Sequence, residues 1–289
     1  GFMTNFDLYR LKKAGMSNLV LNQFLDFISS VTADDRQHPV LLLLPKFIRQ
    51  ATMKHKGLFW ERFKQLDIKA LRQEFLRFPS FSILDKAYPE YLREIYNPPV
   101  LLFYQGDIKL LAMEKIAFVG SRACSKQGIT SIQKIIKELG NQFVVISGLA
   151  RGIDTACHLA AIKNGGRTIS VIGTGLDVSY PRENEQLQSF IAKNHLIITE
   201  YGPGEQALKY HFPDRNRIIA GLSRGVVVSE AKRRSGSLIT CERAMESGRD
   251  VFAIPGNISD GLSDGCHRLI QEGAKLVYQG QDILSEYTY

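Results

Sequence analysis

Hydrophobic positions follow two different rhythms along the chain, and the rhythm changes near residue 80. Before that point apolar residues recur mostly every three or four positions, as in Phe59, Phe63 and Leu66 and again in Leu71 and Phe75. This is the spacing of a buried helix face. Few β-branched runs interrupt it. The pattern predicts a small all-α domain over residues 1–78.

Prolines mark the predicted boundary between the two rhythms. Four of them stand between positions 79 and 99: Pro79, Pro89, Pro98 and Pro99. Proline bars regular continuation of a helix or a central strand. We therefore expect an extended lead-in here, followed by a strand over 100–104 and a second domain over residues 79–289.

From residue 115 onward, short apolar runs alternate with helical patterns. The runs predict strands over 116–119, 143–146, 168–172, 196–199, 225–229 and 250–254, and the patterns predict helices that include 128–139 and 153–162. Strands that are apolar throughout are typical of a parallel sheet covered on both faces. We predict an α/β, Rossmann-like, mostly parallel sheet with helices on both faces.

Charge is unevenly distributed. The chain of 289 residues has a formal net charge of +8, and residues 1–78 hold 13 Lys and Arg against 7 Asp and Glu. The remainder holds 24 against 22. The total is a weak indicator of nucleic-acid binding. Solvated helix faces would explain the N-terminal surplus as well as a DNA- or partner-contacting module would, and packing or dimerisation is an equal alternative for that domain.

Cysteine usage and hydropathy narrow the class of protein. Cys124, Cys157, Cys241 and Cys266 form no CxxC pair, which argues against a zinc site and a disulfide framework. No apolar stretch is long enough to span a bilayer, and no signal-peptide pattern is present. We predict a reduced, cytoplasmic protein with no metal and no membrane partner.

Glycine, serine and basic residues cluster after the predicted strands. Gly120, Ser121, Arg122 and Lys126 follow the 116–119 run and lead into a helix. Amides at a helix start bind anions, although an ordinary tight turn with surface cations explains the segment equally well. It is not a GxGxxG sequence, so a dinucleotide fingerprint is absent.

The next two predicted strands end in the same way. Gly148 and Gly152 flank Arg151 after the 143–146 run, and Arg182 follows Pro181 after the 168–172 run. A structural pairing of Arg151 with Asp154 is the plainer alternative for the first of these. The recurrence at successive strands strengthens the anion-binding interpretation.

Two further segments extend this set. Arg215 and Arg217 flank Asn216 within 212–221, and Ser235, Gly236 and Ser237 precede a helical pattern after a run of three cations. Arginine offers a planar fork suited to phosphate. A solvated charge run is the usual alternative for the triplet 232–234.

The segments lack a catalytic arrangement. Glu200 could act as a general base, but a glutamate that orients loop donors or an arginine is the better interpretation, because no nucleophile or second acid is near it in sequence. The alternative is a nucleotide-processing enzyme of the phosphoribohydrolase type, with Glu200 or Asp177 as acid or base. We predict no catalytic residues and no enzyme activity.

Anion-binding loops at several strand ends would converge on one edge of the sheet. A mononucleotide needs one or two such loops, so the number favours an extended polyanion. Aromatic residues lie among them: Tyr180, Tyr201, Tyr210 and Phe212. This combination is typical of single-stranded nucleic-acid binding.

Apolar residues near the C-terminus are candidates for self-association. His267 has no metal-ligand partner at i+3 or i+4 and lies among apolar residues in 265–277. An edge helix or strand of an open sheet is a common place for pairing. His158 fits better as a satisfied core residue than as a catalytic one.

The ordered motifs resemble the DNA processing protein A (DprA/Smf) family. They are VGSR, SGLARGID, VIGTGLDVSYP, EYGPG, FPDRNRIIAGLS, EAKRRSGSLIT, GRDVFAIPGN and GCHRLIQEGA. The resemblance covers residue 80 to the end, and residues 1–78 are similar to the helical, SAM-like domain of streptococcal-type members.

The resemblance implies a Rossmann-like protein without a cofactor that binds single-stranded DNA. In that family the protein protects incoming DNA and loads the RecA recombinase during natural transformation, usually as a homodimer, with single-strand binding protein as a further candidate partner. It implies a dimer surface at His267, Ile270 and Leu276. Residues and resemblance together give this predicted DNA-contacting set: Gly120, Ser121, Arg122, Lys126, Gly148, Arg151, Arg182, Lys209, Asn216, Arg217, Ser235, Gly236 and Ser237.

Overall fold

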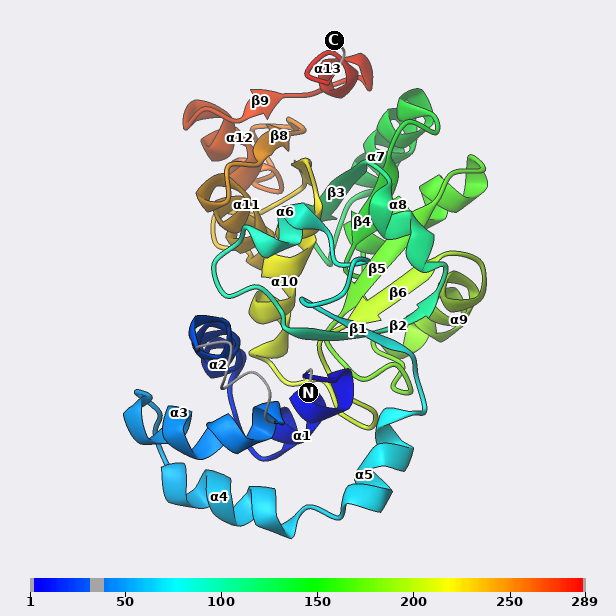
Figure 1. Cartoon of the computed structure of the whole chain (residues 1–289). Coiled ribbons are helices and arrows are strands. Elements are labelled where there is room, and N and C mark those ends of the chain that lie inside the picture. Colours follow the sequence, from blue (N-terminus) through cyan, green and yellow to red (C-terminus); the bar gives the residue numbers. More distant parts are fainter. Residues whose placement is uncertain (1–2, 32–38, 288–289) are drawn as a thin grey trace.

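The N-terminal part of the chain is helical, as predicted. The structure is a computed structural model, and it describes residues 3–31 and 39–287. Figure 1 shows these first helices, in blue to cyan, gathered at one end of the molecule. Their bounds are α1 Asn5–Lys13, α2 Asn18–Ser30, η2 Val40–Leu43, α3 Leu44–Gln50, α4 Lys56–Gln65 and α5 Ile68–Phe75.

The rest of the chain is built on one mixed sheet. Its strands follow the order β1-β2-β6-β5-β4-β3-β7-β8-β9. Strand β2 pairs antiparallel with both β1 and β6, and the other neighbours are parallel. The predicted mostly parallel sheet is confirmed. The strands are β1 Ser80–Ser82, β2 Leu101–Gly106, β3 Lys115–Gly120, β4 Val144–Ser147, β5 Thr168–Ile172, β6 Leu196–Thr199, β7 Gly225–Ser229, β8 Asp250–Ala253 and β9 Lys275–Leu276.

Helices cover both faces of this sheet because its central strands are apolar on both sides. In β3, Ala117 and Val119 face one core cluster, while Ile116 and Phe118 face another. Successive side chains of a strand point to opposite faces, so each face needs its own cover. The helical elements of this part of the chain are α6 Glu90–Arg93, η3 Ile108–Ala112, α7 Lys126–Leu139, α8 Ile153–Lys163, η4 Arg182–Asn184, α9 Glu185–Asn194, α10 His211–Leu222, α11 Gly236–Glu246, α12 Asp264–Gln271 and α13 Gln281–Leu284.

The helical region and the sheet share one apolar cluster. Tyr9 of α1 packs edge-on against Phe103 of β2 with ring centroids 5.4 Å apart, and Phe75 of α5 lies 5.9 Å from the same ring. The cluster continues to Leu149 and Ile172, near the carboxyl ends of β4 and β5. The helices are therefore fixed beside that edge of the sheet. The division into domains at residue 78 stays a prediction.

Cysteines and apolar helices add two observations. All four cysteines are free, and three of them are buried. Within residues 3–31 and 39–287, no helix combines the length and apolar character needed to cross a membrane.

Buried histidine makes the stability of the fold dependent on pH. His158 of α8 is fully buried, and its Nδ1 lies 2.7 Å from the Thr168 hydroxyl. Desolvation, aided by the nearby His195 and Arg215, lowers the pKa of His158 from 6.5 to about 3. Below pH 6.5 the unfolded chain therefore binds a proton that the folded protein does not.

We predict that the folded state loses stability as the pH falls from 7 to 5. The His158 contribution at pH 5 is about 2 kcal/mol, from 1.36 kcal/mol per pKa unit over the interval below 6.5. Urea unfolding at the two pH values measures this loss. A His158→Gln variant should lose less by that amount, and an equal loss in both proteins would contradict the assignment.

Candidate nucleic-acid interface

The strand order reverses between β3 and β7, which is where an open α/β sheet usually binds its ligand. Here the protein fills that position itself. The Glu230 carboxylate, which follows β7, accepts hydrogen bonds from the Ser125 backbone N–H (2.6 Å) and the Ser125 hydroxyl (2.5 Å). Ser125 is the N-cap of α7 and accepts in turn from the Gly128 N–H.

Glu230 changes the interpretation of the loop over 120–128. A helix N-terminus attracts an anion, and at α7 that anion is a carboxylate of the same chain. The Ser121 hydroxyl is used locally and accepts from the Ala123 N–H. The expectation that this turn holds an external phosphate on its own amides is therefore not supported, and the cations Arg122 and Lys126 remain exposed beside it.

A small pocket lies one position along the edge, at the carboxyl ends of β3, β4 and β5. Its volume is about 40 Å³, far below the roughly 300–1,000 Å³ of pockets that enclose a small molecule. It can take part of a ligand but does not enclose a nucleotide. This carboxyl-edge pocket is lined by Arg122, Gly148, Leu149, Ala150, Arg151, Ile172, Gly173, Tyr180, Pro181, Phe212 and Arg215.

Gly152 brings the loops after β3 and β4 together. Its φ is +77°, and a Cβ atom there would lie 2.2 Å from the Ser121 carbonyl oxygen. Only a glycine fits such a close approach in this conformation. The next residue, Ile153, donates its N–H to the same oxygen at 3.1 Å. This contact places Arg122 and Arg151 on one pocket wall.

Arg215 forms the buried wall of the pocket. It is 5% exposed, and its guanidinium donates to the carbonyl oxygens of Gly148 (2.8 Å) and Val171 (2.9 Å). A Cβ atom on residue 148 would lie 2.7 Å from this guanidinium, so glycine is needed there to admit it.

The charge of Arg215 is balanced inside the protein. Burial lowers its pKa, while the Asp154 carboxylate opposes that effect. Burial raises the pKa of Asp154. The charge of Arg215 and the N–H donors of Gly148 and Ala150 partly oppose this rise. A guanidinium stays protonated even so. The guanidinium of Arg215 is therefore a structural part of the pocket wall, and the cations free to meet an anion are the exposed ones at the rim.

Phe212 supplies an aromatic surface in the same pocket. The Arg122 and Arg215 guanidinium carbons each lie 5.4 Å from its ring centroid, and the Tyr180 ring stacks at 5.4 Å with an interplanar angle of 29°. Arginine on an aromatic ring is a stabilising contact. Tyr180 is 42% exposed, so one aromatic side chain beside the cations faces solvent.

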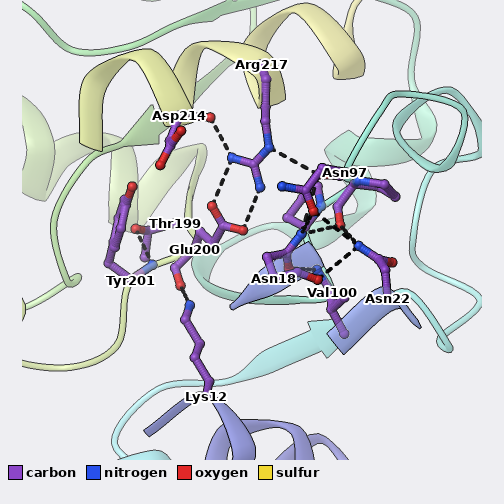
Figure 2. Close-up of polar contacts among 12 residues, drawn as sticks. Lys12, Asn18, Asn22, Asn97, Val100, Thr199, Glu200, Tyr201, Asp214 and Arg217 are labelled. Atoms are coloured by element: carbon purple, nitrogen blue, oxygen red, sulfur yellow. Dashed lines mark hydrogen bonds and ion pairs between the residues drawn. The ribbon is translucent and has the colours of Figure 1, made fainter. Parts of the chain in front are cut away.

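Arg217, which was predicted to contact DNA, lies outside the carboxyl-edge pocket. Its guanidinium makes a two-pronged ion pair with Glu200, at 3.0 and 2.7 Å, and donates to the Asp214 and Asn97 carbonyl oxygens (Figure 2). The side chains of this pair are 13% and 10% exposed. The Glu200 charge and these contacts raise the pKa of Arg217 against the effect of burial. A DNA contact of Arg217 finds no support in this geometry.

The same network reaches the helical region. Lys12 of α1 donates to the Glu200 carbonyl oxygen, and Asn18 of α2 donates to Asn97 Oδ1 (2.7 Å) and accepts from the Val100 N–H (2.9 Å) (Figure 2). Glu200 thus orients an arginine, which is the role that sequence analysis preferred. Because Glu200 binds Arg217 of α10 through its carboxylate and Lys12 of α1 through its carbonyl oxygen, it links α10 to the N-terminal helices.

Sequence reasoning named Arg215 beside Arg217 but left it out of the predicted DNA-contacting set, and a helical interpretation of the segment would have favoured it. Segment 212–221 forms most of α10 rather than a loop. Positions 212 and 215 are three apart and share one helix face, whereas 217 faces away from them. Phe212 and Arg215 therefore line the pocket, and Arg217 with its neighbour Asn216 does not.

The other predicted contacts are exposed cations, residues near the pocket and residues at the start of α11. Arg151 pairs at the surface with Glu183, while Lys126, Arg182 and Lys209 are exposed. Near the pocket lie Gly120, which ends β3, and Arg182, which follows the lining residue Pro181. Ser235, Gly236 and Ser237 begin α11 after β7 and do not line the pocket.

The acids proposed for the enzymatic alternative do not form a catalytic pair. Asp177 accepts from the Gly204 N–H at 2.8 Å and pairs with Arg77 at 3.2 Å. Neither Asp177 nor Glu200 lines the carboxyl-edge pocket. Among the described residues, no group of three or more His, Cys, Asp or Glu side chains could hold a metal ion.

We predict that Glu200→Gln destabilises the protein by about 3 kcal/mol, because it leaves a buried guanidinium without its counter-charge. Urea unfolding measures the change. The matched control is Glu246→Gln, which breaks the exposed 3.2 Å pair with Arg243 and should cost less than about 1 kcal/mol. Equal losses in the two variants would contradict a structural role for the buried pair.

Comparison with solved structures places this arrangement among related proteins. The X-ray structure of DNA processing protein A from Streptococcus pneumoniae matches with a TM-score of 0.94 and 57% identity, covering 100% of both chains. DNA processing protein A from Helicobacter pylori, whose structure concerns a single-stranded DNA binding mode, matches with a TM-score of 0.65 and 28% identity over 73% of this chain and 96% of that one.

Sequence comparison gives the same relatives. The chain is 58% identical over 287 residues to DNA processing protein DprA of Streptococcus pneumoniae, covering 99% of each, and 47% identical over 206 residues to that of Bacillus subtilis, covering 71% of this chain and 69% of that protein. The DNA processing protein A sterile alpha motif domain matches residues 3–71, and DNA recombination-mediator protein A matches residues 80–288. The chain belongs to the DNA recombination-mediator protein A family.

Proposed function

We propose that this protein binds single-stranded DNA across the carboxyl-edge pocket and acts there as a recombination mediator. The strand's phosphates contact Arg122, Arg151 and Arg182, and a base packs against the exposed aromatic surface of Tyr180 and Phe212. Binding of this kind needs cations that follow a backbone and rings that tolerate any base.

The main support for DNA binding at this pocket is the set of side chains that line it. Two guanidinium groups contact one aromatic ring, and the nearby Asp154 carboxylate is occupied by structural contacts. A pocket of this size suits one part of a long ligand that continues over the surface. Proteins that cleave a nucleotide enclose it and aim an acid or base at it.

The proposed cellular role goes beyond the family membership and is supported by it. We propose that the protein protects incoming single strands in the cytoplasm and loads RecA recombinase onto them during natural transformation, with single-strand binding protein as a further candidate partner. No step of this role requires bond cleavage, and we propose that the protein acts without enzyme activity or a cofactor.

We predict that Arg122→Ala weakens single-stranded DNA binding roughly tenfold and reduces the slope of log affinity against log salt by about 0.7, the value for one phosphate contact on a single strand. Fluorescence anisotropy with a labelled oligothymidine at several salt concentrations measures both quantities. Arg122 is exposed, so the substitution leaves the core intact.

The control for this variant is Arg167→Ala. Arg167 is also exposed but precedes β5, at the opposite edge of the sheet. It should bind like the unmodified protein. Salt-insensitive binding, or equal affinities of the two variants, would show that DNA does not bind at this pocket.

The proposed dimer surface lies at an edge of the sheet. Strand β9 is the last strand in the order, and Leu276 on it is 42% exposed. Ile270 of the neighbouring α12 is half-buried, and His267 Nε2 accepts from the Gly256 N–H. An apolar edge of this kind favours pairing with a second copy.

We predict that Leu276→Glu converts a dimer into a monomer, because it places a charge at an apolar contact without disturbing the buried core. Light scattering after gel filtration measures the mass. Leu58→Glu, at a similarly exposed leucine of α4, is the control and should remain dimeric. A dimer that survives Leu276→Glu unchanged would place the interface elsewhere.

A further inference from the structure

Two neighbouring hollows are lined by residues of α7 and α8, which run side by side on one face of the sheet (Figure 1). The first, of about 310 Å³, lies near the start of both helices, and the second, of about 180 Å³, lies near their ends. They share Gln133 and Leu159 as lining residues. Because the two hollows share these residues, they are named together the α7–α8 groove.

The groove begins where the carboxyl-edge pocket ends. Arg151 lines both the pocket and the first hollow. Its guanidinium pairs with Glu183 at this junction, with one contact at 3.4 Å. The pair is about half exposed, and exposed ion pairs of this type are weak. Arg151 can therefore exchange Glu183 for another anion.

The lining of the groove combines an apolar floor with a basic rim. Ile129, Ala156 and Leu159 provide apolar surface, and Leu159 is 50% exposed. Lys137 and Lys163 line the far hollow, and both are exposed. Neither side-chain ammonium has a hydrogen bond or ion pair within the described residues. Of the described residues that line the groove, Glu183 alone is acidic.

We propose that the α7–α8 groove is a second segment of the single-stranded DNA site, in which the strand leaves the carboxyl-edge pocket over Arg151 and reaches Lys137 and Lys163. The proposal rests on the proposed function and extends it. The phosphates face the lysines, and bases lie against the apolar floor around Leu159.

The dimensions fit a short stretch of strand. Helix α8 has 11 residues, which at 1.5 Å per residue gives a path of about 16 Å. Phosphates along one strand of a duplex are about 3.4 Å apart, and an extended single strand spaces them further. The groove therefore holds at most about five nucleotides.

Continuity favours the DNA strand over a protein partner as the occupant. An acidic peptide could pair its carboxylates with the lysines, but its binding would not require that the groove adjoin the pocket. A polyanion that is already bound at Arg122 and Arg151 must leave the pocket on some side. On this side it meets two unpaired ammonium groups and an exposed apolar floor.

The test compares short and long oligonucleotides. The affinity of the Lys137→Ala/Lys163→Ala variant is compared with that of the unmodified protein for oligothymidines of about 6 and about 20 nucleotides. The shorter length lies at the low end of the range for one binding site of this kind, and the longer one exceeds that range. The matched control is Lys109→Ala/Lys193→Ala, which removes two exposed lysines that line none of the hollows described here. Unfolding curves establish that all three proteins are equally folded.

The groove predicts an effect that depends on length. The Lys137/Lys163 variant should bind the long oligonucleotide roughly three- to tenfold more weakly, with a salt slope reduced by about 1.4 for two lost phosphate contacts. It should bind the short oligonucleotide normally. The control should match the unmodified protein at both lengths.

Two outcomes would overturn the inference. Unchanged affinity of the variant at both lengths would show that the strand does not enter the groove and would leave a partner protein as its occupant. An equal loss at both lengths would mean that the lysines act on the pocket itself. Failure of the unmodified protein to bind either oligonucleotide would instead refute the proposed function.

Discussion

The burial of the Arg215 guanidinium is the constraint on which the candidate site depends. A charged group inside a protein needs acceptors for its N–H donors, and here the carbonyl oxygens of Gly148 and Val171 provide them. These contacts fasten α10 to the ends of β4 and β5. They place Phe212, one turn earlier, against Arg122. Without this attachment the aromatic ring and the exposed cations would not form one pocket.

Several of the most distinctive motif residues serve this framework rather than the ligand. Glu230 neutralises the start of α7, and Glu200 pairs with Arg217 to hold α10 against the helical region. Both interactions join residues from different segments. They also pair the α7 N-terminus and the Arg217 guanidinium, which would otherwise attract an anion, with carboxylates of the same chain. The cations left exposed, such as Arg122 and Lys126, are those that precede or begin helices at the edge. The division between buried and exposed charge thus directs an anion to the outer rim.

The fold was predictable from sequence because its strands are short apolar runs with clear ends. Predicted strand 168–172 coincides with β5, and 143–146 differs from β4 by one residue at each end. The antiparallel strand β1 was not predicted, since three residues give too little periodicity. The site was only partly predictable. Choosing between Arg215 and Arg217 required knowing that 212–221 is helical, and the contact of Ser125 with Glu230 joins residues 105 positions apart, which no local pattern reveals.

The central claim is that single-stranded DNA lies across the carboxyl-edge pocket. Photocrosslinking of an oligonucleotide that carries a photoreactive thymine analogue, followed by mass spectrometry of the crosslinked peptides, tests it most directly. The account predicts crosslinks at Tyr180 and Phe212, the aromatic side chains beside Arg122. Crosslinks confined to helices α1–α5 or to segment 232–246, with none at Tyr180 or Phe212, would contradict it.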